Sequence, residues 1–231
     1  MSLVRSLPAL WVALMPLAAH ALEVSIDPHA DLLYRQALPL LEQADSQDNA
    51  SNTLRTALGG DPELNRQGQA MAHTLPTAVA LLKKSVELGH PVAQYRLALY
   101  YMTYLPAAQI ADAACPLLEA SLKQGFAAPA PAIATWCRPY NSSDEYRAAL
   151  EAIPNMATVY APYYPQPASR LACSRSRPQG IEMLWGRQRD YQAEVYRLLG
   201  DLDPQHRLSL LQKAVEINGC VTAQQHLSSR P

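Results

Sequence analysis

The sequence contains little glycine and almost no phenylalanine: nine Gly and one Phe among 231 residues. Runs of β-branched residues are also scarce, which argues against a protein built mainly from strands. Alanine and leucine are abundant instead, and both favour helices. The formal net charge is −1, so the chain lacks the positive surplus that is typical of nucleic-acid-binding domains. We therefore expect an all-α protein and no nucleic acid among its partners.

Motifs for catalysis or metal binding are also lacking. The sequence contains no H-E-x-x-H, no G-x-S-x-G and no phosphate-binding glycine loop. Its four cysteines form no C-x-x-C, which argues against a zinc ribbon and a thioredoxin-type redox site. The histidines are scattered, and for His90 we expect a capping or surface role. We predict that the protein is not an enzyme and has neither a cofactor nor a bound metal.

The N-terminal segment has the organisation of a secretory signal peptide. Arg5 gives a basic start, residues 7–17 form a short apolar run, and Ala19-His20-Ala21 offers a small-x-small cleavage site. The run is too short to span a bilayer. We expect residues 1–21 to be removed, which leaves a periplasmic or secreted bacterial domain over residues 22–231 without a transmembrane segment. The alternative is that this segment forms an apolar N-terminal helix of the folded domain.

A pattern repeats in the middle of the chain. Residues 78–101 align with residues 114–137, so that Gly125 stands 36 residues after Gly89 (125 − 89). Glycine ends a helix at the left-handed position that follows it, and Pro91 is suited to start the next helix. A period of this size is typical of stacked helix pairs.

A degenerate third copy lies at residues 206–227. It shares L-L-x-K-[AS]-V-E-[LI] with the first unit. Asp203-Pro204 is suited to start its first helix and Asn218-Gly219 to form its turn. We place the three repeats near residues 76–103, 112–138 and 204–228. Outside them we expect an amphipathic helix over 29–47, a short helix that starts at Pro62, and a helix over 144–152 capped by Ser143.

The first unit contains the string L-L-K-K-S-V-E-L-G-H-P-V-A-Q-Y-R-L-A-L-Y-Y, which resembles the Sel1-like repeat, a relative of the tetratricopeptide repeat. In the second unit, Pro129 and Pro131 shorten the second helix, and Trp136-Cys137 replaces the tyrosine pair. The resemblance implies antiparallel helix pairs stacked as a short α-solenoid. It also implies a function in protein–protein recognition.

The helical pattern breaks at residues 154–178, where five prolines exclude a regular helix. Structureless runs of this length inside a compact domain are usually functional or disordered. Tyrosine and arginine are also enriched at binding hot spots. The candidate partner-binding residues of this insert are Tyr160, Tyr163, Tyr164, Arg170, Arg175 and Arg177. The alternative is an ordinary covering loop whose tyrosines pack on the helices.

The four cysteines are Cys115, Cys137, Cys173 and Cys220, and an even number in an exported chain favours two disulfides. Cys115 and Cys137 are equidistant from Phe126, the turn of the second repeat. Such positions lie opposite one another in an antiparallel helix pair. We therefore prefer a Cys115–Cys137 bond, which leaves Cys173 to pair with Cys220. The alternative is four buried free thiols.

We expect the protein to act as a scaffold or adaptor in the periplasm, with a protein as its partner and a preformed helical surface as its binding site. A second hypothesis is a periplasmic hydrolase or cell-wall-active enzyme with the insert folded over a pocket. A third is an inhibitor, such as an immunity protein, or a secreted effector.

Overall fold

The computed structural model describes residues 25–57, 62–168, 170–174 and 184–229, and within these ranges the side chains of 47–57 and 62–72 are not described. The predicted signal peptide lies outside the described residues. The α-helices are α1 (Pro28–Ala57), α2 (Pro62–Glu87), α3 (Pro91–Tyr104), α4 (Ala107–Lys123), α5 (Ala130–Trp136), α6 (Asp144–Ala152), α7 (Ala157–Tyr160), α8 (Gln188–Leu202), α9 (Arg207–Asn218) and α10 (Val221–Ser228). Short 3₁₀ helices are η1 (Tyr140–Ser142), η2 (Ile153–Met156) and η3 (Ala161–Tyr163).

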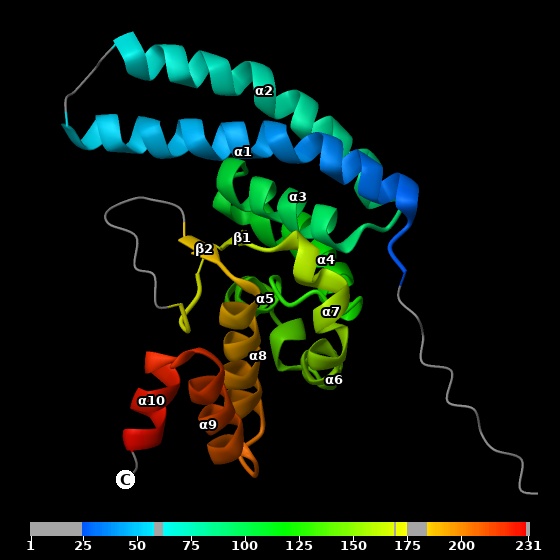
Figure 1. Ribbon diagram of the computed structural model, residues 1–231, viewed down its shortest axis with the longest axis vertical. Helices are drawn as coiled ribbons and strands as arrows, with labels where there is room; N and C mark the ends of the chain where they lie inside the picture. Colours follow the sequence, from blue (N-terminus) through cyan, green and yellow to red (C-terminus); the bar gives the residue numbers. More distant parts are fainter. Residues whose placement is uncertain (1–24, 58–61, 169, 175–183, 230–231) are drawn as a thin grey trace, which may run out of the picture.

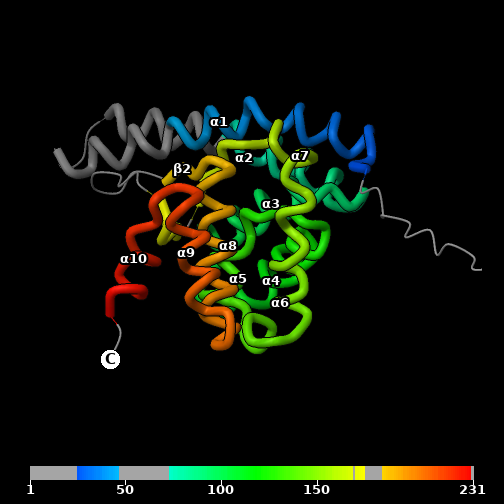
Figure 2. Tube along the Cα trace, turned by 60° about the horizontal axis from the view of Figure 1, so that its bottom comes forward, coloured from blue at the N-terminus to red at the C-terminus, as the bar shows by residue number. Residues whose placement is uncertain are grey.

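The helices stack as pairs, as the sequence predicts. Helices α1 and α2 lie side by side at one end of the molecule, with the pair α3–α4 next to them (Figure 1). Helices α8 and α9 are adjacent in both views and form the other end together with α10 (Figures 1 and 2). The coarse prediction of a mostly helical protein built from stacked pairs is therefore confirmed, whereas a continuous solenoid stays a prediction.

The helix bounds agree with the sequence at some points and differ at three. Helix α1 extends to Ala57 and not only to residue 47. Helix α9 starts at Arg207, after a turn, and not at Asp203-Pro204. Ser143 caps α6, because its hydroxyl accepts a hydrogen bond from the backbone N–H of Tyr146 at 3.1 Å. The helix that starts at Pro62 is long, however, and not short as predicted. It continues past Pro76 to Glu87 and thereby includes the first helix of the first repeat. Pro76 is exposed, so its ring faces solvent on one side of this helix.

The two glycines of the repeat turns take the predicted left-handed conformation. Gly89 has φ +82° and Gly125 has φ +86°, and each is the second residue after the end of a helix of its repeat. Side chains rarely adopt this conformation, which costs about 1–2 kcal/mol for a residue other than glycine. The sequence signal of the repeat therefore corresponds to real helix ends.

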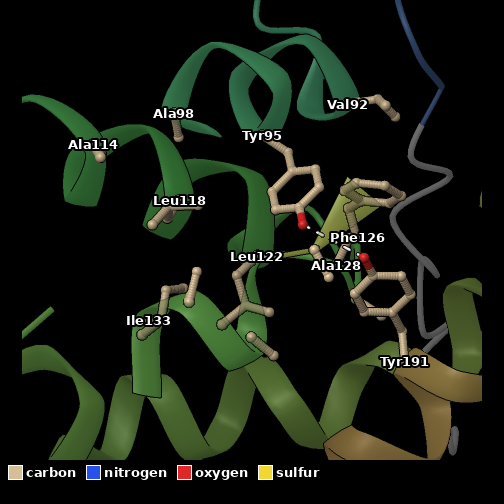
Figure 3. Packing of buried hydrophobic residues seen from close by; sticks show 14 of the residues in the cluster. Val92, Tyr95, Ala98, Ala114, Leu118, Leu122, Phe126, Ala128, Ile133 and Tyr191 are labelled. Atoms are coloured by element: carbon tan, nitrogen blue, oxygen red, sulfur yellow. Dashed lines mark hydrogen bonds between the residues drawn. The ribbon is translucent and has the colours of Figure 1, made fainter. Parts of the chain in front are cut away.

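A core of rings and leucines joins the first two repeats to α8. The ring of Tyr95 meets that of Phe126 edge-on, with 5.8 Å between ring centroids. Leu118 and Leu122 of α4 lie beside them and are fully buried, as is Tyr191 of α8 (Figure 3). Pairs of rings in this geometry add to the free energy of burial alone. Helix α8 is thus part of the same core, whereas the buried residues of α9 and α10 form a second, smaller cluster.

The proline-rich insert is ordered where the structure describes it. After η2, α7 and η3, the chain enters a short strand, β1 (Gln166–Ala168). This strand pairs in antiparallel register with β2 (Leu184–Gly186), so that Pro167 stands opposite Trp185. The prediction of an all-α protein therefore misses a small two-stranded sheet. Within the described residues, no helix is both long enough and apolar enough to cross a membrane.

Two disulfides connect distant parts of the chain. Cys115 of α4 is bonded to Cys137 at the end of α5, and Cys173 is bonded to Cys220 at the start of α10. The first is the pair that the symmetry of the second repeat favours, and the second is the pair that then remains. The bonds span 22 and 47 residues, so each removes about 3–4 kcal/mol of chain entropy from the unfolded state.

The two glycine turns provide a matched pair of substitutions. Gly89→Ala should cost about 1 kcal/mol of stability, because only the backbone conformation is disfavoured there. A Cβ at Gly89 meets nothing within 4 Å, whereas one at Gly125 would lie 2.5 Å from Cγ of Met156. We expect Gly125→Ala to be clearly more destabilising in urea unfolding. Equal losses of unfolding free energy for the two variants would contradict this packing. Adding Met156→Ala to Gly125→Ala should reduce the difference between the two losses.

Candidate binding groove

A groove with a cavity volume of about 470 Å³ lies between the N-terminal helices and the sheet. Its lining includes Leu41 of α1, Leu99 of α3, and Pro167 and Ala168 of β1. Sites that hold ligands usually measure about 300–1,000 Å³ and combine apolar walls with a few polar groups. The groove has this size and this character. We call it the binding groove.

One buried ion pair lies in the wall of the binding groove. Nη2 of Arg96 is 2.7 Å from Oδ2 of Asp45, and the Arg96 side chain is only 4% exposed. The guanidinium carbon also lies 5.8 Å from the centre of the Trp185 ring. A buried charge needs such partners, because removing it from water is otherwise costly. The pair therefore fixes α1 against α3, and the tryptophan contact adds β2.

Exposed aromatic side chains border the binding groove. Tyr104 is 46% exposed and Trp136 is 41% exposed, although both are large and apolar. The ring of Tyr100 lies 4.9 Å from that of Tyr104. Tyrosine and tryptophan are the side chains that most often dominate binding energy at interfaces. The groove thus combines an apolar interior with accessible rings at its edge.

The three predicted contact tyrosines lie elsewhere and are engaged within the protein. Tyr160 is 2% exposed and donates a hydrogen bond to the carbonyl oxygen of Gln124 at 2.7 Å. Tyr163 donates to Oδ1 of Asp31 at 2.8 Å. Tyr164 packs its ring against Phe126 and has a buried hydroxyl. This placement is what the covering-loop alternative anticipates, and a partner contact by these side chains stays a prediction.

The predicted arginines divide into two groups. Arg170 is exposed and contributes to the lining of the binding groove. Arg175 and Arg177 lie outside the described residues. Of the four predicted contact residues that the structure describes, Arg170 is the one at the groove, next to side chains that the sequence does not single out. Asp45 and Arg96 are 51 residues apart, and no local pattern announces their pairing. A weak signal exists for Tyr100 and Tyr104, because residues four apart share a helix face.

The Cys173–Cys220 bond lies in a network of buried polar groups. The backbone N–H of Cys173 donates to Oε2 of Glu194 at 2.8 Å. The amide of Asn218 donates to the carbonyl of Cys173 at 2.6 Å and to Asp190 at 2.9 Å. The segment that follows β1 is therefore fixed to α8 and α9 by hydrogen bonds and to the start of α10 by the disulfide.

His90 is the cap of α3, one of the two roles expected for it. Its Nδ1 accepts hydrogen bonds from the backbone N–H groups of Val92 and Ala93, both at 3.2 Å. Because Nδ1 is an acceptor, the proton is on Nε2, which lies 3.3 Å from Oδ1 of Asp31. The ring also stacks on Tyr34 at 4.9 Å. Both ring nitrogens are thus occupied, which leaves neither available as a general base.

The surroundings of His90 favour its neutral form. Burial lowers the pKa of His90 below its usual value of 6.5, and the interaction with Asp31 opposes this only in part. For Asp31 itself, burial opposes ionisation, but hydrogen bonds from Arg35 and Tyr163 outweigh it and lower the pKa. The contact between Tyr163 and Asp31 therefore connects the insert to an ionised carboxylate.

The described residues contain no group of three or more His, Cys, Asp or Glu side chains arranged to hold a metal ion. Comparison with known proteins gives no match to a family model, to a curated protein or to a solved structure. The site is therefore interpreted from its own geometry.

The state of His90 predicts how stability changes with pH. The unfolded chain takes up a proton near pH 6.5, whereas the folded protein resists it, so the unfolded state binds more protons below this pH. The contribution of neutral His90 to the free energy of unfolding is complete above pH 6.5. It is lost as the pH falls through the lowered pKa of the folded protein. The loss is at most about 1.4 kcal/mol per pH unit.

We expect His90→Asn to flatten this dependence, because asparagine also caps helices but does not titrate. Urea unfolding of wild type and variant between pH 7 and pH 5 measures the difference. His29→Asn, at an exposed histidine, should leave the slope of the wild type unchanged. A parallel pH dependence in wild type and His90→Asn would show that His90 is not the responsible group.

Proposed function

We propose that this protein is an exported, non-enzymatic scaffold or adaptor that holds a protein partner in the binding groove. The observation that carries the proposal is an apolar groove of about 470 Å³ whose edge exposes Tyr104 and Trp136. Rings of this kind supply large contact areas at a low cost in conformational entropy. Such a site is suited to hold an apolar segment of another protein.

The framework around the groove supports this proposal, because it is preformed. The Arg96–Asp45 ion pair fixes two of the walls, and the Cys173–Cys220 bond holds the chain that follows β1. A preformed site orders few groups on binding, so more of the contact energy appears as affinity. Stacked helix pairs with glycine turns are also what a Sel1-like repeat protein would have, and we propose membership of that family together with a short solenoid arrangement.

The chemistry of the lining favours binding over catalysis. The hydroxyl of Thr103 donates to the carbonyl of Leu99 at 2.9 Å, and that of Thr135 donates to Pro131 at 3.0 Å. Both hydroxyls are therefore used inside their own helices, and Arg96 is paired with Asp45. A hydrolase needs a nucleophile and a base that converge on one point. The lining residues that the structure describes offer no such pair.

Two features support an exported location. Disulfides form and persist in oxidising compartments, and the described cysteines are all bonded. The N-terminal segment has the sequence pattern of a signal peptide. We therefore propose a periplasmic or secreted location.

Site-specific photo-crosslinking of the full chain tests the proposed function. A benzophenone amino acid in place of exposed Tyr104 should capture a defined partner in the host, and the same substitution at Leu208 provides the control. Leu208 is equally exposed, at 46%, but does not line the groove. The Tyr104 adduct should disappear when Trp136→Ala is added, since hot-spot truncations cost about 2 kcal/mol or more.

Thermal unfolding of Trp136→Ala should remain close to that of the wild type, because this side chain is 41% exposed. Adducts of the same composition at Tyr104 and Leu208, or an adduct that survives Trp136→Ala in a folded protein, would contradict binding in the groove.

A further inference from the structure

Apart from the side chains of Tyr100, Tyr104, Trp136 and Arg170, the binding groove offers few hydrogen-bonding groups to an occupant. Its threonine hydroxyls and its buried ion pair are used within the protein, and most backbone groups of its helical walls are bonded inside the helices. The strand β1 is also occupied. One edge pairs with β2, and the carbonyl of Pro167 accepts hydrogen bonds from the hydroxyls of Tyr95 at 2.6 Å and Tyr191 at 3.0 Å.

Because these polar groups of the groove wall are already bonded within the protein, the groove favours a helical peptide over an extended one. An extended segment brings its own row of unpaired backbone N–H and C=O groups, and its usual binding site is a free sheet edge that pairs with them. In the binding groove these groups would lose water without gaining partners, which is unfavourable. A helix satisfies its backbone internally and presents only side chains, with apolar anchors at positions i, i+3, i+4 and i+7.

The charges of the lining add a second requirement. The lining contains the guanidinium groups of Arg96 and Arg170 and the carboxylate of Asp45. Arg96 is neutralised by Asp45 at 2.7 Å, while Arg170 is exposed and, among the described residues, forms no ion pair. Among the side chains that the structure describes, Arg170 is therefore a positive charge of the groove that no carboxylate compensates, and it lies beside an apolar surface. An acidic side chain on the occupant would complement it.

We propose that the partner segment that enters the binding groove is an amphipathic helix with an acidic side chain next to Arg170. The apolar face of this helix lies against Leu41, Leu99 and the exposed rings, and its backbone needs nothing from the groove. This inference rests on the proposed function and adds the form and the charge of the segment.

Designed peptides test the form and the charge separately. The probes are fluorescein-labelled, capped peptides of about 15 residues, a length at which a helix is marginal alone and gains from packing. The first has alanines, leucines at i, i+3, i+4 and i+7, and glutamates one turn before and after them. The second replaces the glutamates with lysines, and the third has a central proline. Fluorescence anisotropy measures their binding to the oxidised full chain.

The first peptide should bind most tightly. The central proline should weaken binding at least about 10-fold, because proline costs about 3 kcal/mol inside a helix. The lysine peptide should bind about 2- to 5-fold more weakly than the glutamate peptide, as expected for a partly exposed charge pair. Arg170→Glu should reverse this preference, whereas Arg189→Glu, at an exposed arginine of α8 outside the groove, should preserve it.

Several results would overturn the inference. Equal affinity of the proline peptide would show that the occupant need not be helical, and a charge preference unaffected by Arg170→Glu would remove Arg170 from the contact. If no peptide binds while the Tyr104 crosslink to a partner persists, the inference is wrong and the proposed function stands. If peptides and crosslink both fail while dodecanoate binds, the groove holds a small amphiphile and both proposals are wrong.

Discussion

The carbonyl oxygen of Pro167 lies in the interior of the molecule, and the rest of the structure depends on the two hydroxyls that satisfy it. The segment 154–178, with five prolines, cannot bury its backbone as a regular helix, so its polar groups need partners from elsewhere. Tyr95 supplies one from the first repeat and Tyr191 supplies the other from α8. These two tyrosines therefore connect α3 and α8 through one peptide group. They also hold β1, and with it part of the groove wall, in place.

The segment from η3 to Cys173 acts as a strap, and three of its attachments differ in chemistry. Tyr163 joins it to Asp31 on the first helix, Pro167 to the core, and Cys173 to the final helix pair. These three are a charge-assisted hydrogen bond, a pair of buried neutral hydrogen bonds and a covalent bond. Because the groove lies between the first helices and this strap, its shape is a property of the whole chain and not of any single repeat.

Local signals of the sequence describe the helices well and the groove poorly. Gly89, Gly125 and Pro91 mark helix ends for steric reasons that hold in any context, and the symmetry about Phe126 suffices to pair Cys115 with Cys137. The sheet has no comparable signal, because β1 and β2 have three residues each and are joined by tertiary packing. The tyrosines of the insert show a deeper limit. A tyrosine side chain can contribute to a binding hot spot or pack in a core, and its sequence position alone does not tell which of the two applies.

The distribution of groove residues along the chain has a consequence for biosynthesis. Leu41 and Asp45 leave the ribosome early, Arg96 and Trp136 later, and Pro167 and Arg170 later still. Tyr191, which holds the strap, follows them, and Cys220 comes near the end. During synthesis, the residues of the helical walls therefore precede those that complete the groove. Any partner that recognises the groove discriminates against incomplete chains, so that it engages only molecules whose synthesis and oxidation are finished.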